Sequence, residues 1–194
     1  MPRTRKLLLT TLVVGATSAV AGLGVFAAFT AQTTNTGNQI ASGTVAIGQN
    51  SGGVAIYNVT NGGPGQTTQR CIRVTYTGTL PATVKLFRSN TVTQGTAFNL
   101  QVERGSGLNP TTNPYPSCTG FTPDSPGGSL YNGTLIGFPT SYLAGPDAKG
   151  AAWAQGDTVD YRFTITVIDD PTPNTHDTVI QSGSHAFTWE ARNN

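Results

Sequence analysis

The sequence is short of charge. Of its 194 residues only 10% are charged, and the formal net charge is +2. Arg3, Arg5 and Lys6 account for three of the eleven basic residues, so the remainder of the chain has eight basic residues against nine acidic ones. That remainder has no surplus of positive charge to attract phosphate groups or anionic lipids. The composition therefore argues against a nucleic-acid-binding protein.

Motifs for catalysis and metal binding are also missing. The two histidines, His176 and His185, and the two cysteines lack the CxxC and HExxH spacings of zinc sites. The sequence has no Gly-x-Ser-x-Gly motif and no pair of carboxylates that stands out for glycoside hydrolysis. Asp169, Asp170 and Asp177 carry oxygen ligands suited to Ca²⁺, but an Asp-Asp-Pro run also simply ends a strand in a turn. We therefore predict that the protein is not an enzyme and binds no cofactor. A calcium site at these three aspartates is the alternative.

Cysteine is scarce, since only Cys71 and Cys118 are present. If the chain is exported, as its first residues predict below, an even pair is most simply a disulfide, because the compartment outside the cytoplasm is oxidising. In the chain-entropy model a loop of this span stabilises the fold by about 4 kcal/mol. Two free thiols are the alternative.

The first 28 residues have the pattern of a secretory signal. A basic start is followed by Leu7 to Ala28 without a single charge, and this run ends in small residues. We expect cleavage between Ala28 and Phe29 and a secreted, extracellular protein. The alternative is an uncleaved membrane anchor, because the run is about long enough to span a bilayer. The membrane would be a partner only through that segment.

Helical periodicity is missing from the chain after the signal, and short alternating runs bounded by Gly, Pro or Asn take its place. The clearest run is 158–168, where apolar residues face one way and Asp160, Arg162, Thr164 and Thr166 face the other. Such alternation is typical of antiparallel strands with one face in a core and one in water. The expected strands are 44–47, 54–59, 69–76, 83–87, 98–102, 130–136, 158–168 and 186–191. The sequence thus predicts an all-β sandwich or jelly roll.

Three smaller expectations concern loops and aromatic residues. Residues 109–128 are rich in Pro, Ser, Thr and Gly and are interpreted as a long surface loop, and 139–143 as one helical turn. Trp189 is in phase with Phe187 and is expected in the core. Trp153 lies in a Gly- and Ala-rich stretch and is predicted to be an exposed aromatic.

Three groups of segments carry a resemblance to a known family. They are 24–29 with 40–47, 61–66 with 74–80, and 179–183 with 187–191. Together they resemble the TasA/camelysin family of secreted biofilm-matrix proteins. The first group resembles the family's signal-peptide end before Phe and its FASGTLDL-like first strand. The second is similar to the LKPGD turn and a strand ending in N-N-G-S-L, although Gln66 stands where the family usually has Asp. The third is similar to Q-G-x-S followed by F-x-F-E-A.

The resemblance implies a signal peptide at 1–28, an extended N-terminal segment at 29–39 and an antiparallel jelly-roll β-sandwich at 40–194. It also implies self-assembly into matrix fibres, in which an N-terminal strand completes the sheet of the next subunit. The candidate donor strand includes Phe29, Ala31, Thr33 and Asn35; a disordered mature N-terminus is the alternative. Part of the family has been described as a metallopeptidase.

These observations leave three hypotheses. The first is a secreted structural subunit that partners with itself or with other matrix proteins. The second is a monomeric module that binds polysaccharide or a surface protein through its loops. The third and most remote is a metallopeptidase.

Overall fold

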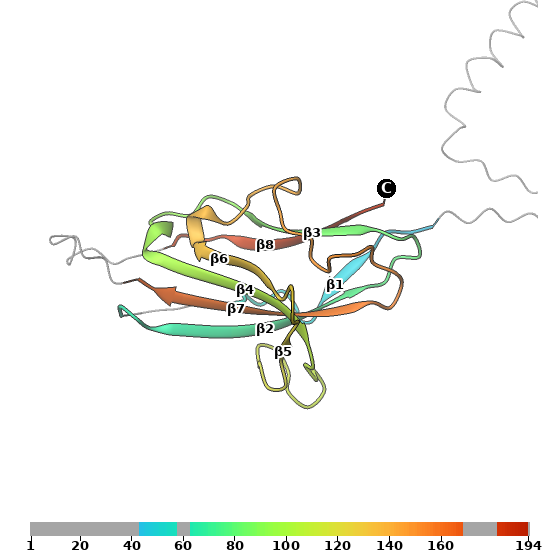
Figure 1. The fold of residues 1–194 in the computed structure, drawn as a ribbon, viewed down its shortest axis with the longest axis horizontal. Helices are drawn as coiled ribbons and strands as arrows, with labels where there is room; N and C mark the ends of the chain where they lie inside the picture. The colour runs from blue at the N-terminus through green and yellow to red at the C-terminus, as the bar shows by residue number, and fades with distance from the viewer. Residues whose placement is uncertain (1–42, 58–62, 169–181, 194) are drawn as a thin grey trace, which may run out of the picture. The chain divides into compact units, whose positions relative to one another are not determined.

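The computed structural model describes residues 43–57, 63–168 and 182–193, and these residues form an antiparallel all-β fold (Figure 1). The signal segment, its cleavage site and the segment at 29–39 lie outside the described residues. The elements in chain order are β1 (Ile47–Gln49), β2 (Thr67–Tyr76), β3 (Thr83–Ser89), η2 (Gly95–Ala97), β4 (Phe98–Ser106), β5 (Thr122–Pro123), β6 (Ser129–Thr134), η3 (Leu135–Gly137), β7 (Thr158–Val167) and β8 (Ala186–Arg192).

Two sheets face each other. The larger sheet has the order β1-β2-β7-β4, and both β5 and β6 pair with the far edge of β4. The smaller sheet contains β3 and β8, and in Figure 1 these two strands form a separate layer beside β2, β7 and β4. Every ladder is antiparallel, as the one-sided alternation predicted.

The core lies between the two sheets, because each strand turns its apolar positions inward. Leu100 and Val102 of β4 and Val84 and Leu86 of β3 are completely buried. Phe163 joins the layers, with its ring centroid 4.7 Å from that of Phe187 on β8. The inner positions of β7 are all buried as predicted: Val159, Tyr161, Phe163, Ile165 and Val167.

The outer face of β7 differs from the prediction. Asp160 was expected in water but is 1% exposed, and Thr164 is buried as well. Asp160 is covered by the chain after β4, which folds back over this end of the strand so that the N–H of Leu108 donates to Asp160. The Cys71–Cys118 disulfide joins β2 to that segment, and the main-chain N–H of Cys71 donates to the carbonyl of Pro116. The predicted disulfide is therefore present, and a face that alternation assigned to solvent is partly covered.

Two expected strands near the start of the described chain are wrong in part. Residues 43–46 are not a strand, because β2 ends at Tyr76 and the carbonyls of Thr44 and Ala46 accept hydrogen bonds from the turn at 77–80 instead. Residues 54–57 form no strand either. They follow a turn in which Gly52 and Gly53 adopt positive φ, and that turn takes the chain out of sheet geometry.

Trp153 is the clearest error among the side chains. It is completely buried, whereas the sequence predicted an exposed aromatic. Residues 139–153 fold along the outer edge of β3, and Trp153 exchanges two main-chain hydrogen bonds with Ala82 at 3.1 and 2.8 Å. The indole then packs against Tyr76. In the same stretch the turn expected at 139–143 lies two residues later, where the N–H of Gly145 donates to the carbonyl of Ser141.

Candidate assembly edge

The outer edge of β8 pairs with no other strand in the part of the chain that the structure describes. On β3 the main-chain groups of Ala82, Val84, Leu86 and Arg88 point away from β8, because they bond to Trp153, Ala148, Pro146 and Pro139. Successive residues of a strand point their main-chain groups to opposite sides, so the odd-numbered residues of β3 must bond to β8. The register pairs Lys85 with Glu190 and Phe87 with Thr188.

It follows that the even-numbered residues of β8 face β3. The N–H and C=O groups of Phe187, Trp189 and Ala191 point to the other side, where no strand among the described residues pairs with them. Although β1 comes close to β8, no ladder joins the two strands. On this side the two sheets of the described domain therefore stay open, and three consecutive outward positions offer unused main-chain donors and acceptors.

The side chains along this edge are apolar and only half-buried. Phe187, Trp189 and Ala191 pack against the core from its margin. The ring of Trp189 lies 5.4 Å from Tyr161 between centroids, and its indole Nε1 is buried without a hydrogen-bond partner. An added strand would cover more of these side chains, as well as satisfying the edge itself.

A histidine marks the beginning of the edge. The Tyr57 hydroxyl lies 2.5 Å from His185 Nε2, and His185 Nδ1 is 3.1 Å from the carbonyl of Gly183. The carbonyl requires a proton on Nδ1, so Tyr57 donates to Nε2 of a neutral ring. Burial lowers the pKa of His185, and the nearby Arg88 charge lowers it further. Burial also raises the pKa of Tyr57 far above its ordinary value.

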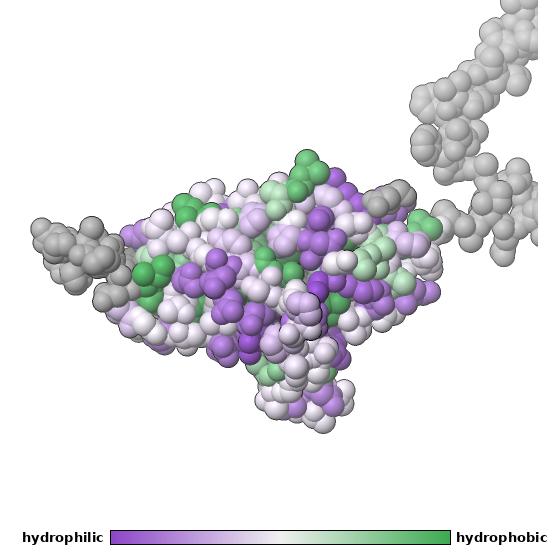
Figure 2. Space-filling view, in the orientation of Figure 1, coloured by the Kyte–Doolittle hydropathy of each residue, from purple (hydrophilic) through white to green (hydrophobic). Residues whose placement is uncertain are grey.

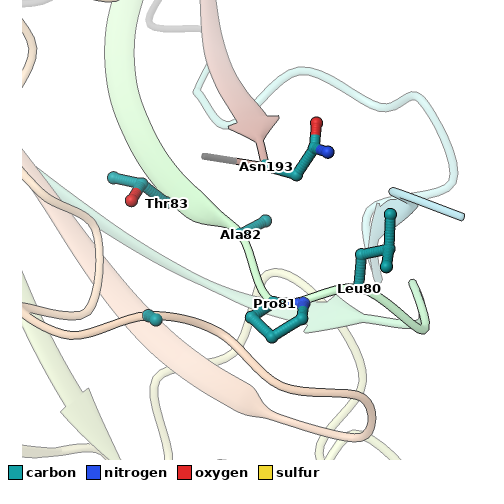
Figure 3. A pocket seen from close by; sticks show the side chains of 6 residues that line it. Leu80, Pro81, Ala82, Thr83 and Asn193 are labelled. Carbon is teal, nitrogen blue, oxygen red and sulfur yellow. The ribbon is translucent and has the colours of Figure 1, made fainter. Parts of the chain in front are cut away.

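A shallow groove lies at the other end of the edge. It is lined by Leu80, Pro81, Ala82, Thr83, Ala152 and Asn193, at the start of β3 and the end of β8 (Figure 3). None of these lining side chains titrates in water near neutral pH, so the groove offers no acid or base for catalysis.

The rest of the surface shows no comparable apolar feature on the face that Figure 2 presents. Green apolar groups appear there in small separate spots among white and purple residues. The large exposed apolar side chains in the described part are Val45, Val54, Ile136 and Leu143, which lie in different segments of the chain. Isolated apolar residues of this kind are normal on a protein surface.

The predicted site residues divide into two groups. Cys71 and Cys118 are bonded to each other, and His185 lies at the beginning of β8. Ala28, Phe29, Ala31, Thr33 and Asn35, together with Asp169, Asp170, His176 and Asp177, lie outside the described residues. Within the described ranges, no cluster of three or more His, Cys, Asp or Glu side chains could hold a metal ion.

Sequence reasoning missed Tyr57 and Arg88. Tyr57 was assigned to a strand, and its contact with His185 spans 128 positions of the chain. Arg88 follows Val84 and Leu86 at alternate positions of β3, and this spacing was the available signal that an arginine would point inward. In the part of the chain that the structure describes, no helix is long and apolar enough to cross a membrane.

These features define an antiparallel all-β protein with a disulfide-anchored outer loop and an open sheet edge. Its sequence matches no model of a known protein family. A search of curated proteins found no match either.

Proposed function

We propose that this chain is a secreted structural subunit that assembles with copies of itself by pairing strands at a sheet edge. The open side of β8 is the observation that supports the proposal most directly. At its three outward positions no described residue pairs with the main-chain groups, and its apolar side chains are half-buried. An exposed edge of this kind is a template for strand addition, and a soluble protein usually protects it with charge, proline or a covering segment.

The outer edge of β8 has few of the features that usually protect a sheet edge from pairing with another chain. Between Ala186 and Arg192 there is no proline, and the only charged residues are Glu190 and Arg192. Arg192 Nε lies 2.6 Å from Glu190 Oε1, so the two charges neutralise each other. Both belong to the even-numbered set, whose main-chain groups already bond to β3. The main-chain groups of the outward positions therefore remain open to an incoming strand.

The proposed occupant is the segment 29–39 of a neighbouring copy. It contains no charge and no proline, so it could contribute a continuous run of main-chain donors and acceptors. Adding it beside β8 would extend the smaller sheet to three strands and bring the fold closer to the proposed jelly-roll sandwich. Removal of residues 1–28 would free the segment from a membrane-inserted signal.

A decisive test compares the exported chain with a variant that lacks residues 29–38. Negative-stain electron microscopy and sedimentation should show fibres for the first and monomers for the second. Adding a synthetic peptide of residues 29–39 in excess should cap growing ends and shorten the fibres. A full-length mature protein that stays monomeric at high concentration would contradict the proposal.

A binding module is the second candidate, and the outer loop favours it. Residues 107–121 project from the larger sheet beside β5 (Figure 1) and contain no charged residue. Asn109 caps a turn there by accepting from the N–H of Thr111 at 3.2 Å, and the disulfide anchors the far end. A rigid, polar, uncharged loop suits polysaccharide better than a charged partner. Retention of a monomeric protein on a polysaccharide column, lost on reduction, would support this alternative.

A further inference from the structure

Arg88 is a buried cation that pairs with no carboxylate among the residues that the structure describes. It occupies the last inward position of β3 after Val84 and Leu86, and only 3% of it is exposed. The six ion pairs among the described residues do not include it. Its Nε atom is buried with no hydrogen-bond partner. Buried charges in proteins are normally paired, because an unpaired one is very costly to remove from water.

Within the described ranges this guanidinium has one hydrogen-bond partner, and that partner is neutral. Arg88 Nη1 donates to the main-chain carbonyl of Asn90. Asn90 has φ +68°, a left-handed conformation that is uncommon outside glycine. This turn brings the carbonyl of Asn90, two residues after Arg88, next to the guanidinium. The carbonyl satisfies one donor, but it supplies no negative charge.

The described titratable groups on which the Arg88 charge acts are neutral. Its charge acts on Tyr57, Tyr131 and His185, lowering the pKa of each. The Tyr131 hydroxyl donates to Thr134 O at 2.6 Å, and Tyr57 donates to His185. None of these three residues is acidic, so the neighbourhood adds dipoles but no compensating charge.

We infer that Arg88 binds a small monovalent anion, either a halide such as chloride or a small carboxylate such as formate, at the end of the core where β3 stops. The unpaired Nε–H would donate to the anion, and the guanidinium charge would neutralise it. The proposed anion is small because a bulky one could not reach a side chain that is only 3% exposed. The inference does not depend on the proposed assembly, since it concerns groups inside one subunit.

The test measures how anions change the thermal unfolding of the exported chain. Chloride and formate are titrated separately as sodium salts, with Arg88→Met compared against Arg70→Met. Arg70 is half-exposed and donates to the carbonyl of Gln69, so its loss changes net charge by the same amount without touching the site. At ten times the dissociation constant, the wild type and Arg70→Met should gain about 3 °C or more in Tm. Arg88→Met should gain none of this.

A second readout does not depend on unfolding. The ³⁵Cl NMR line should broaden with the wild type and narrow again when formate displaces chloride, and Arg88→Gln should give no broadening beyond buffer. A rise in Tm with formate but not with chloride would identify the carboxylate as the ligand. Equal salt effects in the wild type and the Arg88 variants would overturn the inference, as would a wild type that responds to neither salt. The Tm and NMR measurements still test the inference if Arg88→Met proves unstable, because Arg88→Gln is an independent variant that removes the same charge.

Discussion

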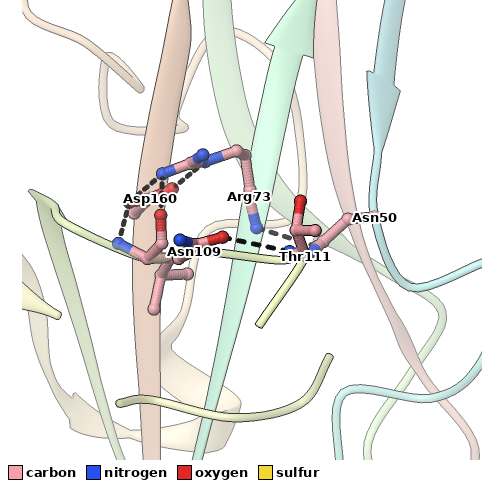
Figure 4. Close-up of polar contacts among 6 residues, drawn as sticks. Asn50, Arg73, Asn109, Thr111 and Asp160 are labelled. Atoms are coloured by element: carbon pink, nitrogen blue, oxygen red, sulfur yellow. Dashed lines mark hydrogen bonds and ion pairs between the residues drawn. The ribbon is translucent and has the colours of Figure 1, made fainter. Parts of the chain in front are cut away.

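Arg73 and Asp160 form a two-point ion pair across neighbouring strands of the larger sheet. Arg73 Nε lies 2.6 Å from Asp160 Oδ1, and Nη2 lies 2.8 Å from Oδ2 (Figure 4). The same Nη2 donates to the carbonyl of Leu108, whose own N–H donates to Asp160 at 2.8 Å. The pair therefore fixes the start of the outer loop as well as joining β2 to β7.

Replacing Asp160 should destabilise the fold substantially. Asp160→Ala leaves the Leu108 N–H and the Arg73 guanidinium without their acceptor, at a cost of about 2 to 4 kcal/mol; the lower part of that range applies because Arg73 is partly exposed. Urea unfolding followed by tryptophan fluorescence measures the change. The control is Asp124→Ala, which removes the more exposed pair with Arg104 and should cost less than about 1 kcal/mol. Equal effects of both variants would contradict this assignment.

Loss of the disulfide should weaken the fold and loosen the outer loop together. Cys71 and Cys118 are 47 positions apart, and the chain-entropy model gives about 4 kcal/mol for such a cross-link. We expect the Cys71→Ala/Cys118→Ala variant to unfold at lower urea concentration and to be cut by protease within residues 107–121. Two reactive thiols in denatured, unreduced wild-type protein would show that the bond does not form.

A proline on the open edge should block assembly and spare the fold. The N–H of Ala191 points away from β3, so Ala191→Pro removes a donor that no described residue uses. Fibres should be lost while Tm changes by only a few degrees. Ala191→Ser keeps the N–H and should assemble like the wild type. If Ala191→Pro still forms fibres, β8 is not the edge through which subunits join.

Stability should fall as the pH decreases below about 6.5. The unfolded chain binds a proton at His185 with its ordinary pKa, whereas burial lowers the pKa of the folded residue, so protons favour unfolding. His185→Gln should therefore lose less stability between pH 7.5 and 5.5 than the wild type does. His176→Gln serves as the control for the same substitution at the other histidine. An unchanged slope in His185→Gln would contradict the prediction, and chemical denaturation at each pH measures it.

Alternation along the chain was sufficient to predict most of the strands. The pattern of β7 identified five inward residues correctly, because side chains of a strand alternate whatever lies on either side. The signal segment, the donor strand and the calcium alternative remain predictions from the sequence, since their residues lie outside the described ranges.

The sequence by itself determined the strand pattern, the antiparallel class and the pairing of the only two cysteines. Tertiary structure alone decided what covers each strand. Alternation distinguishes two faces, but it cannot say that a distant loop shields one of them, and so Asp160 was placed in water although it is buried. Trp153 was predicted to be exposed because its neighbours are Gly and Ala, and that composition does not reveal that residues 139–153 fold along β3. The sequence also cannot show which sheet edge remains open, because the partners of a strand come from distant parts of the chain. In the structure no described strand joins the outer side of β8.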